Sequence, residues 1–175
     1  MLSYAPDRIP RDAVDTVIAF SFGNRVAADG AITAGPTNEA LAATIEGFVG
    51  EHPAPVFAQH EIAHLLQRHG VERVTSIDPV VGPDGTLVYL STAGVAEAIV
   101  QHAAGAGIVL GAVGVIGFAD HAVRCVLTAR AAGLDAGVPV GVVLPSAYDP
   151  ESGQPWTRDR RSYLGADLLG RVATT

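Results

Sequence analysis

Apolar runs that end in short polar turns, each followed by a helical pattern, recur along the whole chain. The clearest runs are DTVIAF (15–20), PVFA (55–58) and GIVLGAVGVI (107–116). They lead into the polar turns SFGN (21–24), QHE (59–61) and GFADHAVR (117–124). Ligands of open parallel sheets bind just beyond the carboxyl ends of the strands. The pattern therefore predicts an α/β fold whose ligand site lies in these turns.

The remaining elements complete one three-layer domain. Further strands are expected at 74–77 and 138–144, and a local hairpin around the Pro-Asp-Gly turn within 80–90. Start signals, glycine stops and apolar periodicity predict helices at 36–52, 61–69, 92–104, 121–132 and 158–172. Glu39 is placed in the first turn of the first of these helices, and Gly105 near the end of the third. We expect a Rossmann-like α/β/α sandwich with about five mostly parallel strands, formed by residues 1–175 as a single domain.

Composition narrows the classes of partner. The 175 residues are 49% hydrophobic and carry a formal charge of −7, with no basic run of the kind that nucleic-acid binding requires. The uncharged stretch 103–119 is too short and too rich in glycine for a membrane span. No export signal is apparent, and the single cysteine, Cys125, lies in an apolar helical stretch. These features predict a soluble cytoplasmic protein with a buried, inert thiol and no nucleic-acid or membrane partner; the abundant Ala, Gly, Val and Asp indicate a GC-rich bacterial gene.

The string HEIAH (60–64) is the first candidate for chemistry. On a helix it places His60 and His64 one turn apart on one face, with Glu61 beside them to activate a metal-bound water. This is the arrangement of zinc peptidases, and it gives the alternative interpretation of a zinc-dependent hydrolase. Three residues elsewhere could supply the third ligand, but none lies in a recognisable second motif: Glu97, His102 and His121.

The second candidate spans most of the chain. In order, it comprises VIAFSFGNRVAADGAIT, PTNEALAATI, PVFAQHEIAHLLQRHGV, YLSTAGVAEAI and VGVIGFADHAVRCVLTARAAGLD. The chain resembles the YdcF-like and SanA-like family over residues 13–172. The positions that match the family pattern are Gly23, Asp29-Gly30, Glu61, Ser91-Thr92, Glu97, His121 and Arg124. The chain departs from that pattern at Ala58-Gln59-His60, where a double glycine is usual, and at Gly117-Phe118, where Thr-Ser is usual.

The resemblance implies a small polar ligand, anionic or similar to a nucleotide or S-adenosylmethionine, at the carboxyl edge of the sheet. His121 and Arg124 share the first turn of a helix whose dipole favours an anion. We expect Arg124 to contact the anion. If the protein is an enzyme, we expect His121 and Glu61 to carry out acid/base chemistry. A ligand-binding module without catalysis is the equal alternative. The other predicted ligand-binding residues are Gly23, Asn24, Asn38, Gln59, Ser91, Thr92 and Glu97.

Several of these residues also have a structural interpretation. Ser91 and Thr92 precede a helix and could simply cap it, and Gly23 could serve only a tight turn. Trp156, in the long loop 146–156, either pins the entry to the last helix or closes over a ligand.

Overall fold

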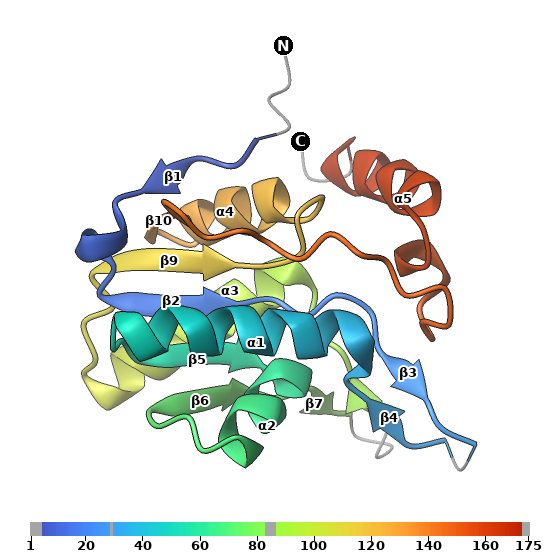
Figure 1. Ribbon diagram of the computed structural model, residues 1–175, viewed down its shortest axis with the longest axis horizontal. Helices are drawn as coiled ribbons and strands as arrows, with labels where there is room; N and C mark the ends of the chain where they lie inside the picture. Colours follow the sequence, from blue (N-terminus) through green and yellow to red (C-terminus); the bar gives the residue numbers. More distant parts are fainter. Residues whose placement is uncertain (1–4, 29, 83–86, 173–175) are drawn as a thin grey trace.

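A six-stranded parallel sheet forms the centre of the molecule. The computed structural model describes residues 5–28, 30–82 and 87–172, and Figure 1 shows their arrangement. The strands of the central sheet are β1 (Arg8–Ile9), β2 (Thr16–Ala19), β5 (Val56–Gln59), β6 (Val74–Ile77), β9 (Ala112–Ile116) and β10 (Asp135–Pro139). Two antiparallel pairs extend from it, β3 (Arg25–Val26) with β4 (Ile32–Thr33) and β7 (Val80–Val81) with β8 (Leu87–Val88). The helices are α1 (Gly35–Glu51), α2 (His60–Arg68), α3 (Thr92–Ala106), α4 (Ala122–Ala131) and α5 (Arg160–Val172), with short 3-10 turns η1 (Arg11–Ala13) and η2 (Pro155–Thr157).

The order of strands reverses beside the central strand. The order across the sheet is β1-β10-β9-β2-β5-β6, and every pair in it is parallel. From β2 the chain first adds β5 and β6 on one side, then returns to add β9 and β10 on the other. In doubly wound folds the loops part at such a reversal and leave a crevice for ligands. Here the reversal lies between β2 and β9.

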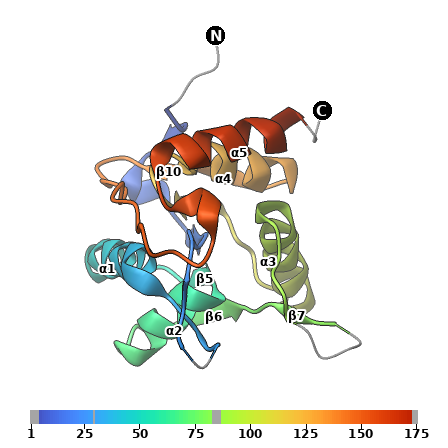
Figure 2. The same cartoon turned by 90° about the vertical axis from the view of Figure 1, so that its right-hand side faces the viewer.

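Helices cover both faces of this sheet, as the sequence predicts. Val17 and Ala19 of β2 pack into a core with α1 and α2, whereas Ile18 and Phe20 pack into a second core with α3 and α4. Figure 2 shows α1 and α2 on one side of the sheet and α3 on the other. The alternation along β2 follows from the two-residue period of a strand. The expected three-layer Rossmann-like sandwich is confirmed.

Two strand predictions need correction, and three short strands were not predicted. The strand expected at 138–144 is β10, which ends at Pro139 because Gly141, at φ +84°, turns the chain out of the sheet. The run 107–116 is a strand only from Ala112, because α3 extends to Ala106 and Gly107 caps it at φ +65°. The prediction missed β1 and the β3–β4 pair, whose strands have two residues each.

The ends of the helices are close to the predicted ones. Gly70 and Gly133 follow α2 and α4 with positive φ, as expected of helix stops. Gly105 is not a stop, since it lies inside α3, and Glu39 lies beyond the first turn of α1, which begins at Gly35. The β7–β8 pair agrees with the expected hairpin, whose Pro83-Asp84-Gly85 turn lies outside the described residues, as does Asp29.

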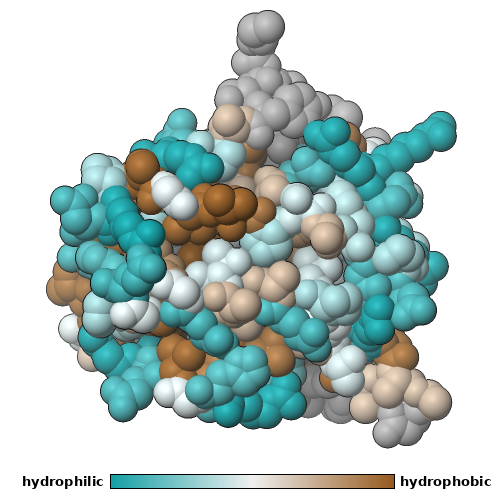
Figure 3. Space-filling model, in the orientation of Figure 1, coloured by the Kyte–Doolittle hydropathy of each residue, from teal (hydrophilic) through white to brown (hydrophobic). Residues whose placement is uncertain are grey.

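The structure also bears on two expectations from composition, the burial of Cys125 and the membrane-spanning potential of the helices. Cys125 is fully buried, and this burial raises the pKa of its thiol, as expected of an inert cysteine. Among the described residues, no helix has both the length and the hydrophobicity to cross a membrane. In Figure 3 hydrophilic side chains cover most of the visible face, with a hydrophobic patch in its upper part.

The turn after β2 depends on a glycine. Gly23 has φ +70°, and a Cβ atom there would lie 2.6 Å from Ser152 Oγ and 2.7 Å from Thr157 Oγ1. Gly70 has a similar φ of +80° but open space around the Cβ position. The backbone conformation disfavours a side chain at both positions, whereas only Gly23 also lacks the room for one.

We therefore expect Gly23→Ala to lower the free energy of unfolding by about 3 kcal/mol, from backbone strain plus overpacking. Gly70→Ala should cost only the strain, about 1 kcal/mol. Urea unfolding of both variants measures the difference. Equal losses would show that the contacts with Ser152 and Thr157 do not restrict this turn.

Candidate functional site

A crevice of about 300 Å³ opens at the carboxyl edge of the sheet, where the strand order reverses. The turn after β2, the end of β5 and the start of α4 contribute to its wall, together with the segment before α3 and the loop around η2. Six of the predicted site residues line it: Gly23, Gln59, Ser91, Thr92, His121 and Arg124. The structure thus brings together residues from four separate turns.

Four other predicted residues do not line the crevice. Glu97 is exposed on α3, and Asn24 is buried, with its carbonyl accepting hydrogen bonds from Gly153 N at 2.7 Å and Ser152 Oγ at 3.2 Å. Asn38 is buried in α1, and Glu61 lines a neighbouring cleft.

Asn38 supports the crevice from beneath. Its side chain has no solvent exposure, and its Oδ1 accepts a hydrogen bond from Phe22 N at 2.9 Å. Its Nδ2 donates to the carbonyls of Gly23 at 2.8 Å and Ala34 at 2.7 Å. The amide therefore fixes the turn after β2 against the start of α1.

Three helices begin at the wall of the crevice. Their N-cap residues are Gln59 for α2, Ser91 for α3 and His121 for α4, and all three line the crevice. The Ser91 hydroxyl accepts a hydrogen bond from Gly94 N at 3.1 Å, so the capping interpretation of Ser91 is confirmed. Gln59 Oε1 accepts one from Ser21 N at 3.1 Å. The positive ends of three helix dipoles thus meet around one space.

His121 and Arg124 belong to a buried polar network with α5. His121 Nδ1 lies 3.3 Å from Arg124 Nε and 2.8 Å from Tyr163 Oη, and Asp167 Oδ1 lies 3.2 Å from the same Nε. Tyr163 Oη also donates to Asp167 Oδ1 at 3.3 Å, so the four side chains form one connected network. Burial also raises the pKa of Tyr163, so its hydroxyl keeps its proton. The sequence did not indicate Tyr163 or Asp167, which lie 42 and 46 positions after His121 in the chain.

The end of the long loop 146–156 and η2 contribute Gln154, Trp156 and Thr157 to the wall of the crevice. Tyr148 packs edge-on against Phe118, which stacks on Phe22 at 4.0 Å between ring centroids. Trp156 lines the crevice and is 50% exposed. Arg25 holds the loop through two hydrogen bonds to Asp149, at 2.8 and 2.9 Å.

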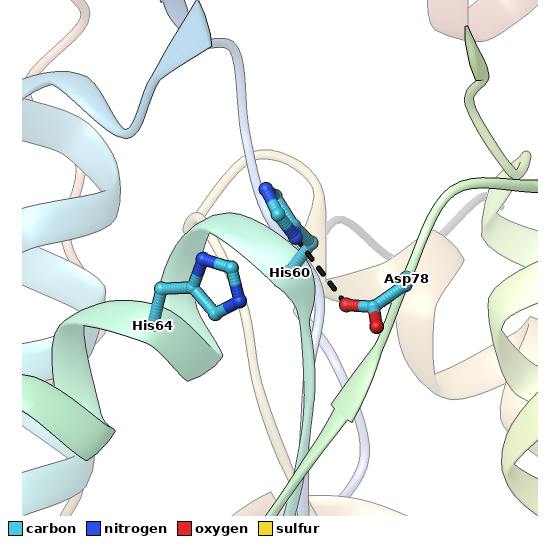
Figure 4. A group of neighbouring side chains, drawn as sticks. All are labelled: His60, His64 and Asp78. Atoms are coloured by element: carbon cyan, nitrogen blue, oxygen red, sulfur yellow. Dashed lines mark hydrogen bonds and ion pairs between the residues drawn. The ribbon is translucent and has the colours of Figure 1, made fainter.

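The HEIAH residues lie beside a second cleft, of about 550 Å³, between α2 and the β4 segment. His60, Glu61 and His64 all line it. Figure 4 shows His60 and His64 next to Asp78, which follows β6. One donor atom from each of these three residues lies within 4.8 Å of the others. No such group among the described residues includes the sequence-derived candidates Glu97, His102 or His121.

Asp78 is the residue that sequence reasoning missed at this cleft. Its carboxylate accepts a hydrogen bond from Ser76 Oγ at 2.5 Å and lies 3.3 Å from His60 Nδ1. The bond from Ser76 lowers the pKa of the Asp78 carboxyl, and the interaction with His60 lowers it further. Its position directly after a predicted strand was the available signal, because β5 and β6 end at the same edge.

Comparisons with protein-family models, with curated proteins and with solved structures find no match for this chain. The resemblance to YdcF-like proteins stays a prediction, and the residues themselves carry the functional argument.

The Tyr163 hydroxyl should stabilise the network between α4 and α5. We expect Tyr163→Phe to lower the free energy of unfolding by about 1–2 kcal/mol, because His121 Nδ1 loses a buried partner. The matched variant Tyr148→Phe should cost less than about 1 kcal/mol, since Asp120 keeps Arg160 as a partner. Chemical denaturation compares the two, and an equal or smaller loss for Tyr163→Phe would contradict the role of the network.

The Arg25–Asp149 pair should make loop stability depend on pH. Hydrogen bonds from Arg25 hold the pKa of Asp149 below its ordinary value, so its stabilisation is present above the unfolded-state pKa of about 3.9 and is lost as pH falls through the folded-state pKa. We expect Asp149→Asn to destabilise the protein at pH 7 and the difference from wild type to shrink below about pH 4. Glu151→Gln is the control, because Glu151 also pairs with Arg25 but is 75% exposed. Urea unfolding at pH 7 and below about pH 4 measures these losses. Equal losses for Asp149→Asn and Glu151→Gln at both pH values would contradict the role of the Arg25–Asp149 pair.

Proposed function

We propose that the protein binds a small anionic, nucleotide-like ligand in the crevice at the carboxyl edge of the sheet. The convergence of the N-termini of α2, α3 and α4 on this space carries the proposal. Helix N-termini offer unpaired backbone N–H groups and a positive dipole end, which favour phosphate and carboxylate groups. The location at the strand reversal between β2 and β9 supports it independently.

Arg124 is the cationic group proposed to contact the anion. Its Nε is engaged by His121 and Asp167, and its side chain is 32% exposed along the crevice. The terminal Nη groups make no hydrogen bond to any residue in the described part of the chain. Asp167 therefore orients the guanidinium, and the Nη groups are left for a ligand.

Aromatic side chains favour a ligand that also carries a flat ring. Trp156 and Tyr89 line the crevice on segments that lie outside the central sheet, and Trp156 is half exposed. An aromatic face can stack on a nucleobase whatever the identity of that base. A volume of about 300 Å³ matches the lower end of small-molecule sites.

Ligand binding is the core of the proposal, and His121 is its candidate acid/base group. His121 lines the crevice, and its Nδ1 lies within hydrogen-bond distance of Arg124 Nε and Tyr163 Oη, which orient the ring. Glu61 lines the other cleft, so the proposed proton transfer rests on His121 alone. We also propose that the protein belongs to the YdcF-like family and is cytoplasmic. The residue pattern and the doubly wound fold support the family membership.

Trp156, the single tryptophan, provides a direct test. Titration of the full chain in the presence of EDTA with phosphate, nucleoside monophosphates and S-adenosylmethionine should change its fluorescence saturably for at least one nucleotide-like compound. Arg124→Gln should weaken that binding about 10- to 100-fold, the loss expected for a charged hydrogen bond. The same ligand should raise the melting temperature.

Arg161→Gln is the control, since it removes an exposed positive charge on α5 from a residue that does not line the crevice. If Arg161→Gln and Arg124→Gln weakened binding equally, the ligand would be responding only to the net charge of the protein. That result would overturn the site. The absence of any response to all the compounds would overturn the proposed function. Melting curves of both variants establish that they are folded.

A further inference from the structure

We propose that His60, His64 and Asp78 form a binding site for one zinc ion at the carboxyl ends of β5 and β6. Gln59 at the end of β5 pairs with Ile77 at the end of β6. His60 and Asp78 directly follow these two strand ends, so the two residues leave the sheet next to each other. His64 follows one turn later on α2 and joins them from the same helix.

The separation of the donors suits a single metal ion. The three donor atoms lie within 4.8 Å of one another, and the rings of His60 and His64 are 4.1 Å apart between centroids. A tetrahedral zinc ion with bonds near 2.0–2.1 Å holds its ligands about 3.4 Å apart. The donors must therefore close by at most about 1.4 Å, which rotations of partly exposed side chains can supply.

The chemistry of the donors selects the class of metal. Two imidazoles with one carboxylate suit zinc and similar transition metals, whereas magnesium and calcium prefer oxygen ligands alone. Three protein donors also leave the fourth tetrahedral position open for water or a ligand, as in catalytic zinc sites. That position would face the 550 Å³ cleft lined by His60 and His64.

Ser76 is a positioning residue for this site. Its hydroxyl, on β6, donates to Asp78 Oδ1 at 2.5 Å, two residues further along the chain and just beyond the strand. Such an outer partner fixes the orientation of a carboxylate ligand and raises the affinity of a metal site.

Glu61 gives an independent indication that a ligand belongs here. The residue is only 5% exposed, yet its Oε2 is buried without a hydrogen-bond partner in the described structure. It lines both the large cleft with His60 and His64 and a small space beside Asp78. A buried carboxylate oxygen without a partner is costly, and a water on a neighbouring metal ion would supply the missing donor.

Zinc titration of the EDTA-stripped full chain tests the site. We expect one equivalent of zinc, retained through gel filtration. His64→Ala and Asp78→Asn should weaken binding by more than about 100-fold, and Ser76→Ala by about 10- to 100-fold, the range for an outer-shell partner. Glu61→Gln should retain one equivalent, because Glu61 is not a ligand.

His69→Ala is the matched control, since His69 is an exposed histidine just after the same helix and pairs with Glu46 instead. Binding that survives in Asp78→Asn, or that falls equally in His69→Ala, would overturn the assignment, as would less than one equivalent in the wild type. Cobalt substitution adds a spectroscopic readout, because the strong visible absorption of tetrahedral cobalt should disappear in Asp78→Asn. Circular dichroism checks that each variant is folded. Arg124→Gln should bind zinc as the wild type does, so this result stands apart from the crevice proposal.

Discussion

The backbone pairing of β2 with β5 on one side and β9 on the other is the constraint on which the rest of the molecule depends. Parallel strands need crossover connections, which place helices on both faces of the sheet. Because β5 lies on one side of β2 and β10 on the far side of β9, the crossovers after β2 and after β9 leave in opposite directions. Those departures separate the turn after β2 from the turn after β9. The crevice is the space that this separation leaves, and its wall is made of whatever residues end the strands.

The wall of the crevice is held in place by hydrogen bonds from neighbouring side chains, some buried behind it and some at its surface. Asn38 ties the turn after β2 to the start of α1, and Ser152 and Thr157 occupy the space that a Cβ atom on Gly23 would need. Tyr163 and Asp167 play the same part for His121 and Arg124. A rigid arrangement behind the exposed groups lowers the entropy lost when a ligand binds.

The sequence predicts the layers well because the physical causes are local. Continuous apolar runs such as 55–58 need burial on both faces, and glycines such as Gly70 and Gly133 take conformations that end helices. Register and length are harder, since β10 ends at Pro139 only through the turn at Gly141. The two-residue strand β1 gives no periodic signal, because its contribution is backbone pairing with β10.

Several of the site residues that the sequence predicts follow strand ends, whereas Ser91 and Thr92, predicted by resemblance, lie at the start of α3. Gln59, His121 and Arg124 could be identified from their positions in the chain, and Asp78 could have been found by the same reasoning applied to β6. Tyr163 and Asp167 could not, because their contacts with His121 and Arg124 depend on how α5 packs on α4. Glu97, placed by resemblance alone, lies exposed on α3.

The end of β5 has a property that neither cleft reveals by itself. Gln59 faces the crevice, His60 faces the neighbouring cleft, and Gln59 and Tyr89 also line the small space beside Asp78. Gln59 and His60 share a peptide bond, so a backbone displacement at one of them also moves the other. Any free-energy coupling between the two compartments is reciprocal: occupancy of one would alter affinity at the other by the same factor in both directions. The peptide bond between residues 59 and 60 therefore links the backbone of the crevice wall directly to that of the neighbouring cleft.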